Sequence, residues 1–249
     1  MILTHTKVAG RQKALWFTAV PLTAVATLLA LTSQTRPATG GVEDLAFTGQ
    51  MIAIFTGIAY AAAFPGFLTG SVRLGMSELE ASTPVSPAVL RAAKVAGAFL
   101  VVVTPSFVVL LLVAARQTVG GRPVALFDAV LVTLTVVAPA ALSAMALSGF
   151  AGALLPRALG RIAALLVWLL AVFSSPLVPL PTVNGTVFTF VGDAVVSGFF
   201  HTDPIYEAQG PLPVDGSASG AVLSLLWQAC LILILLVVGT ALAQRSRNR

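Results

Sequence analysis

The sequence predicts an all-α integral membrane protein that forms one domain over residues 1–249. Three observations support this prediction. Charged residues make up only 9% of the chain, whereas a soluble domain carries roughly 25%. The mean hydropathy is +0.98. Six apolar stretches each approach or exceed the roughly 20 residues that a helix needs to cross the apolar core of a bilayer.

The six predicted membrane-spanning helices are separated by polar connections. The first apolar run is too long for the core of a signal peptide and lacks a convincing small-residue cleavage site, so we expect it to be retained. No internal repeat is visible in the sequence. The predicted spans cover about residues 14–32, 49–70, 92–115, 127–151, 161–180 and 220–243.

The distribution of Lys and Arg predicts the orientation of these spans. With the N-terminus inside, eleven basic residues lie on the inner side and three, Arg36, Arg116 and Arg122, on the outer side. Because short cytoplasmic loops carry an excess of Lys and Arg, both termini are expected in the cytoplasm. A composition rich in Ala, Val, Leu and Pro is compatible with a high-GC bacterium, so we expect a bacterial cytoplasmic (plasma) membrane.

Residues 182–200 are apolar enough to suggest a seventh span. However, two glycines and Asp193 interrupt the segment, and Pro179 and Pro181 precede it. A seventh crossing would also place the basic C-terminus outside, against the charge bias. We therefore expect an extracellular re-entrant or surface-lying helical element between the fifth and sixth spans, buried against the rest of the protein.

The span interiors contain none of the ionisable residues that ion-coupled transporters usually place at mid-membrane. The chain also lacks a phosphate-binding loop and the common hydrolase motifs, so we expect neither an enzyme nor a bound cofactor. The basic residues lie in separate short loops rather than along one face, which argues against nucleic-acid binding.

We expect no metal site and no disulfide. His201, Asp203 and Glu207 could be drawn as metal ligands, but a solvated external loop fits them better. Cys230 stands alone within an apolar span, so it has no partner for a disulfide or a thiol metal site.

Polar residues concentrate in "SELEASTPVSPAVLRAAK", residues 77–94, between the second and third spans. Ser77 and Glu80 have the spacing of a capping box, which starts a helix. Pro84 ends that helix, and Pro87 suits the first turn of the next one. The pattern predicts a short cytoplasmic helix that is either a solvated connector or a docking surface.

This stretch and the six spans resemble the permease subunits of ABC-2-type ABC transporters. The shared pattern is E-x-E-x-S-T-P-V-S-P followed by Arg and Lys. The resemblance implies that the loop is the coupling helix, which sits in a groove of a separate cytoplasmic ATPase. The family usually begins with a long amphipathic surface helix, whereas only about thirteen residues precede the first span here. The implied docking residues are Ser77, Glu78, Leu79, Glu80, Ser82, Thr83 and Pro84.

The resemblance also implies partners and a function. Two ABC ATPase subunits would bind ATP and Mg, and a second permease chain, identical or paralogous, would complete the pathway in the bilayer. The cargo of such an exporter would be amphipathic, lipid-like, a peptide or a drug. Spans two and five would line the route, although ordinary packing is the more common role for such residues. The candidates are Thr56, Tyr60, Phe64, Ser174 and Ser175.

Two other functions remain open at this point. The chain could be a non-transporting membrane anchor or sensor within a larger complex. It could also be a secondary transporter or channel that needs no ATPase, because some such sites use backbone carbonyl groups instead of charged side chains.

Overall fold

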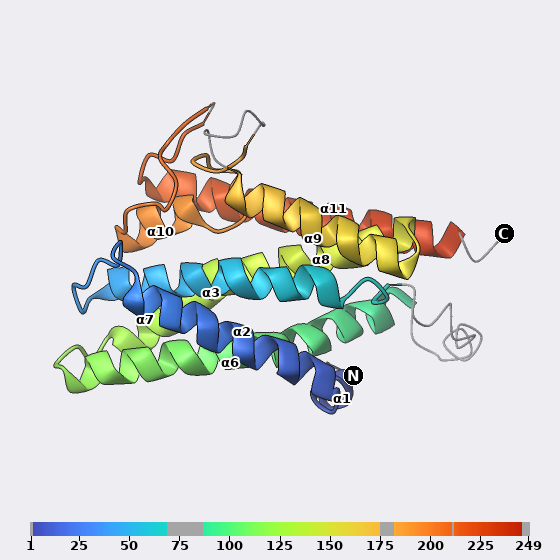
Figure 1. Ribbon diagram of the computed structural model, residues 1–249, viewed down its shortest axis with the longest axis horizontal. Helices are drawn as coiled ribbons and strands as arrows, with labels where there is room; N and C mark the ends of the chain where they lie inside the picture. The colour runs from blue at the N-terminus through green and yellow to red at the C-terminus, as the bar shows by residue number, and fades with distance from the viewer. Residues whose placement is uncertain (1, 69–86, 175–181, 211, 246–249) are drawn as a thin grey trace.

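The computed structural model describes residues 2–68, 87–174, 182–210 and 212–245, which form an elongated bundle of helices (Figure 1). The described residues form no strand, and their one isolated β-bridge pairs Thr186 with Pro213. The prediction of an all-α fold is therefore confirmed.

The helices follow one another with short connections wherever the chain is described. A π-helical turn, η1, joins α7 to α8, so these three elements form one continuous column. The helices are α1 (Ile2–Gly10), α2 (Lys13–Thr32), α3 (Val42–Ala63), α6 (Pro87–Val119), α7 (Ala125–Val132), η1 (Thr133–Val137), α8 (Ala138–Leu154), α9 (Arg157–Phe173), α10 (Asp193–Phe200) and α11 (Ala218–Arg245).

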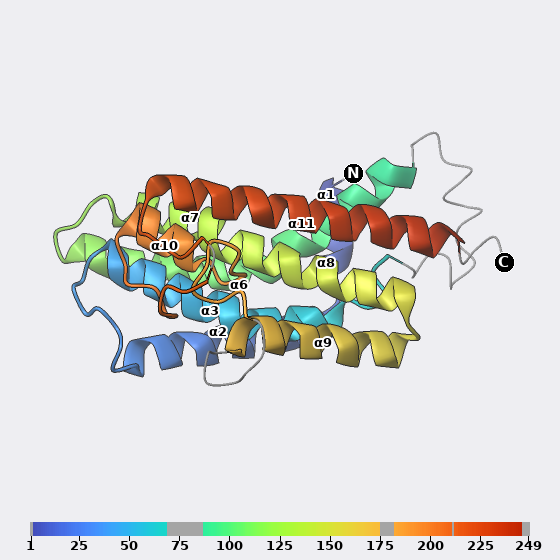
Figure 2. The ribbon, with the colours of Figure 1, turned by 90° about the horizontal axis from the view of Figure 1, so that it is seen from above.

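The long helices run along the bundle in alternating directions (Figures 1 and 2). α2, α6 and α9 run one way, and α3, the α7–η1–α8 column and α11 run the other way. As a result, α1 and the last turn of α11 lie at the same end of the molecule. The short helix α10 lies at the opposite end.

Five helical segments of the described chain are long and apolar enough to cross a membrane: Leu15–Thr32, Val42–Ala63, Ala92–Val119, Ala125–Leu154 and Ala218–Arg245. The protein is therefore a multi-pass membrane protein by the length and composition of its helices.

The predicted fifth span, 161–180, corresponds to α9, which has 17 residues. At 1.5 Å per residue, α9 is about 25 Å long, slightly less than the apolar core of a bilayer. It ends because Ser174 adopts an extended conformation, with φ −66° and ψ 132°. Pro176 follows two residues later, and proline cannot continue a helix. Residues 175–181 lie outside the described part of the chain.

α3 begins seven residues before the predicted start of the second span at residue 49. The predicted bounds leave the acidic pair at 43–44 outside the span, but Asp44 is buried in the first turn of α3. Its Oδ2 accepts hydrogen bonds from Arg36 Nη2 at 3.1 Å and from the Gly40 amide at 2.9 Å. These partners compensate for the burial of the carboxylate. The predicted start of this span at residue 49 is therefore corrected to Val42.

The predicted fourth span, 127–151, contains Pro139, and a proline inside a helix commonly kinks it. The structure places the π-helical turn Thr133–Val137 immediately before this proline. Proline lacks an amide hydrogen and crowds the preceding turn, and a wider turn accommodates both effects. The Ala138 amide accordingly donates to the Thr133 carbonyl, five residues back.

α3 is the central helix of the bundle. In this helix 78% of the span is buried inside the chain, against 28% in α2 and 17% in α11. Small residues let α8 approach it closely, because a Cβ on Gly152 would lie 1.7 Å from the Pro65 carbonyl oxygen. α9 approaches through Trp168, which covers Gly57.

The predicted helical element at 182–200 is helical only from Asp193 to Phe200. Residues 182–192 form turns instead, which corrects that expectation. The reason is local, because Gly185 and Gly192 have φ angles of +77° and +76°, in the left-handed region that interrupts a helix. α10 then packs against α11 and α3 at the end of the bundle remote from α1 (Figure 2).

Candidate functional site

Charge separates strongly along the bundle. Every acidic residue of the described chain lies on α3's first turn, on α7, on α10 or in the connection from α10 to α11. All of these lie at one end of the bundle. The opposite end carries most of the described bases, on α1, at the start of α2, near the starts of α6 and α9 and at the end of α11. Such an asymmetry is typical of a membrane protein whose basic end faces the cytoplasm.

The residues predicted to dock an ATPase, 77–84, lie outside the described part of the chain, so their conformation and contacts remain a prediction. The structure does describe both flanks. The chain leaves α3 through a turn that reaches Leu68 and returns at Pro87, the first residue of α6. Both flanks lie at the basic end of the bundle (Figure 1).

Two of the predicted pathway residues, Thr56 and Tyr60, are buried in the middle of the chain's own bundle. Thr56 Oγ1 donates to the Ile52 carbonyl at 2.7 Å within α3. Tyr60 donates from its hydroxyl to the Val102 carbonyl at 2.7 Å and so joins α3 to α6. Their role in a transport route stays a prediction.

The other described candidates lie at opposite ends of the bundle. Phe64 follows α3 at the basic end, is buried, and packs edge-on against Phe67. Ser174 follows α9 and bonds with Thr182, whose hydroxyl lies 2.9 Å from the Ser174 hydroxyl. Ser175 lies outside the described residues. Of the predicted set, Phe64 borders a cavity at the basic end.

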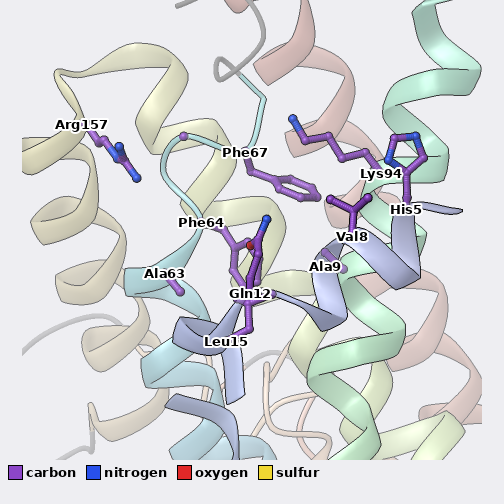
Figure 3. Close-up of a pocket in the computed structure, with 12 residues that line it drawn as sticks. His5, Val8, Ala9, Gln12, Leu15, Ala63, Phe64, Phe67, Lys94 and Arg157 are labelled. Carbon is purple, nitrogen blue, oxygen red and sulfur yellow. The ribbon is translucent and has the colours of Figure 1, made fainter. Parts of the chain in front are cut away.

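That cavity has a volume of about 430 Å³ and lies at the basic end of the bundle (Figure 3). Three bases, His5, Lys94 and Arg157, line it together with the aromatic rings of Phe64 and Phe67. The described lining contains no acidic residue. The remaining lining residues are Val8, Ala9, Gln12, Leu15, Ala63, Gly66 and Ala98.

Close packing of α1 against α6 forms one wall of this cavity. A Cβ on Gly97 would lie 2.8 Å from the His5 carbonyl carbon and from the Thr6 amide nitrogen. Only glycine permits this approach. It places His5 against Gly97, which lies about one helical turn after Lys94 on α6. Lys94 Nζ in turn lies 5.8 Å from the centre of the Phe67 ring, within the range of a cation–π contact.

The first turn of α9 forms the opposite wall. Arg161 Nε donates to the Ala62 carbonyl at 3.0 Å and ties α9 to the end of α3. Gly160 lets α9 pack closely against α8, since a Cβ at this position would lie 3.0 Å from the Ala151 carbonyl oxygen. Arg157 consequently lies beside Gly66 and directs its guanidinium towards the cavity (Figure 3).

A second polar cluster lies at the acidic end, around the fully buried Asp193. Its Oδ1 accepts hydrogen bonds from Gln50 Nε2 at 2.5 Å and from the Ile205 amide at 3.1 Å. Gln228 Nε2 donates to the Thr189 carbonyl at 3.2 Å and connects α11 to the same segment. The cluster therefore fastens the segment around α10 to α3 and α11.

Burial raises the pKa of Asp193 to about 6, because the charged carboxylate loses its hydration inside the protein. Its hydrogen bonds from Ile205, Gln50 and Thr189 act in the opposite direction, since they stabilise the charged form. The hydrogen-bond partners of this carboxylate, Gln50, Thr189 and the Ile205 amide, carry no positive charge. The group can therefore change its charge within a mildly acidic pH range.

Sequence reasoning missed both the cavity and the Asp193 cluster. The cavity brings together four segments that are remote along the chain, and no local motif marks such a convergence. For the cluster a signal existed, because Asp193 and Gln50 are polar residues within apolar stretches. Within the described residues, no group of three His, Cys, Asp or Glu side chains could hold a metal ion.

Comparisons of this chain with protein-family models, with curated proteins and with solved structures found no match.

Proposed function

We propose that the chain is the membrane-spanning permease subunit of an ATP-driven ABC exporter, energised by a separate ATPase that docks on residues 77–87. One observation carries the proposal. The segment with the coupling-helix pattern connects α3 to α6, and both of its described flanks lie at the basic end of the bundle. That is the end expected to face the cytoplasm, where ATP is available.

The exposed surface of the bundle supports a role within the membrane. α2, α9 and α11 direct large apolar side chains outward, among them Phe17, Leu166 and Leu233. A soluble protein rarely exposes so much contiguous apolar surface, whereas lipid or a second permease chain would cover it. With five segments of sufficient length and the shorter α9, the chain supplies half of a pathway, and an identical or paralogous chain supplies the rest.

Transport through this fold would use its central helix. Tyr60 joins α3 to α6 through the hydrogen bond from its hydroxyl to the Val102 carbonyl, close to Pro105 in α6. Proline leaves a carbonyl in the preceding turn without its helical partner, which weakens the helix locally. We expect α3 and α6 to separate at this point when the ATPase pulls on their connection, and amphipathic cargo to pass along the opened face.

The experiment compares ATP hydrolysis in the reconstituted complex of this chain with its ATPase, in the presence and absence of cargo. Glu80→Lys and deletion of residues 78–83 should each abolish cargo-stimulated hydrolysis without unfolding the bundle. Asp203→Lys makes the same change of charge at the acidic end and should leave the stimulation intact. If cargo still stimulated hydrolysis in both loop variants, the docking role would be wrong.

A further inference from the structure

We propose that the cavity at the basic end binds the phosphate-bearing headgroup of an anionic membrane lipid. The site is the 430 Å³ cavity between α1, the end of α3, α6 and the start of α9. The inference does not depend on the transport function, because it follows from the position, charge and shape of this cavity alone.

The cavity lies at the depth where lipid headgroups are found. Three of its lining residues, Leu15, Ala63 and Lys94, are at or within two residues of the ends of apolar spans. Those ends mark the boundary between the apolar core of the bilayer and its polar headgroup region. A ligand in the cavity would therefore have one end at headgroup level and the other beside lipid chains.

The charge of the lining selects an anion. Lys94 and Arg157 are basic side chains, and the described lining offers no carboxylate to neutralise their charge. Lys94 and Arg157 enter from opposite sides of the cavity (Figure 3). A phosphate group has oxygens on all sides, so it can accept hydrogen bonds from two separated donors at once.

The apolar part of the lining selects an amphiphile rather than a free ion. Phe64, Phe67, Leu15 and Val8 form a surface next to the bases (Figure 3). A volume of about 430 Å³ falls in the range of sites for small organic molecules and exceeds what a phosphate ion needs. Basic pockets between membrane helices on the cytoplasmic side are suited to anionic lipid headgroups.

Another cavity, between α6 and the α7–η1–α8 column, provides a contrast. It has a volume of about 230 Å³ and has no charged lining residue. Lipid chains could cover such a surface without any headgroup preference. Of these two cavities, the basic one combines charged and apolar lining residues, and the other does not.

The test measures lipid binding to the purified full chain in detergent, by native mass spectrometry with phosphatidylglycerol and with zwitterionic phosphatidylcholine. The wild-type chain should bind phosphatidylglycerol at least about tenfold more tightly than phosphatidylcholine. Lys94→Gln with Arg157→Gln should remove most of this preference. Lys7→Gln with Arg245→Gln removes the same charge from the same end without touching the cavity lining, and it should keep the preference.

A second variant tests the volume separately from the charge. Val8→Trp keeps all three bases but fills the space beside Phe67, so it should also weaken phosphatidylglycerol binding. Circular dichroism confirms that each variant retains its helices. Inorganic phosphate at millimolar concentration should not displace the lipid.

Three results would overturn the proposal. The first is equal binding of the two lipids by the wild-type chain. The second is an equal loss of preference in the two charge-matched double variants, because general attraction to the basic end would then explain it. The third is displacement of the lipid by inorganic phosphate, which would make a soluble anion the occupant.

Discussion

Asp193 is a fully buried acid whose hydrogen-bond partners carry no positive charge. Its raised pKa, about 6 in the folded chain against 3.8 as the ordinary value, makes stability depend on pH. Between these values the folded state binds more protons than the unfolded state. The contribution is therefore complete below about pH 4 and is lost as the pH rises through 6.

Asp193→Asn should remove this dependence while keeping the hydrogen bonds from Gln50 and Ile205, because an amide oxygen also accepts them. Relative to the variant, the wild-type chain should lose on the order of 3 kcal/mol of unfolding free energy between pH 4 and pH 7. Thermal unfolding in detergent at several pH values measures the difference. If the stability of the two chains changed in parallel with pH, the raised pKa of Asp193 would be contradicted.

Gly152 is the residue with the tightest backbone contact among the described glycines, since its Cβ would lie 1.7 Å from the Pro65 carbonyl oxygen. Gly152→Ala should destabilise the chain by about 1–3 kcal/mol, because backbone cannot move aside cheaply. Gly66→Ala is the control, since its Cβ would have its nearest neighbour, Arg157 Nε, at an ordinary 3.7 Å. Denaturant or thermal unfolding compares the two, and equal stabilities would show that α3 and α8 are not packed in this way.

At the scale of elements, α1 is held by its packing on α6 at Gly97. Gly97→Val should displace α1, so that its amide hydrogens exchange with solvent at least about tenfold faster. In Gly10→Val the new Cβ would lie 4.0 Å from Val101, so exchange should change little. Hydrogen-exchange mass spectrometry of the α1 peptide makes the comparison, and unchanged protection in Gly97→Val would exclude this contact as the anchor.

The elements themselves were largely predictable, because a run of some 20 apolar residues has few alternatives in a membrane. The predicted starts of the first and sixth spans lie within two residues of α2 and α11. The early start of α3 depends on polar contacts that a hydropathy pattern does not reveal. Arg36 and Gly40, eight and four residues before Asp44, donate hydrogen bonds to its carboxylate and so allow it to be buried in the first turn.

The candidate site was less predictable than the elements. The sequence indicates a distinct segment at 77–94, because caps and prolines act locally. The basic cavity could not be foreseen, since His5, Lys94 and Arg157 meet only after α1, α6 and α9 have packed. The hydrogen bond between Gln50 and Asp193 likewise spans 143 residues of sequence.

At the scale of the whole molecule, the separation of charge predicts a fixed orientation. In a Cys230→Ala background, Ala208→Cys at the acidic end should react with a membrane-impermeant maleimide on intact cells. Gln12→Cys at the basic end should react only after the cells are permeabilised, because the excess of bases belongs inside. The opposite pattern of labelling would show that the orientation is inverted and that the docking segment lies outside the cytoplasm.

The central claim is that another, ATP-hydrolysing protein holds the connection between α3 and α6. A photo-crosslinking amino acid at position 80, introduced in living cells, tests it most directly, with position 203 as the control at the acidic end. The account predicts that position 80 captures a nucleotide-binding ATPase and that position 203 does not. Capture of no ATPase at position 80, under conditions in which the chain is inserted and transport is active, would contradict it.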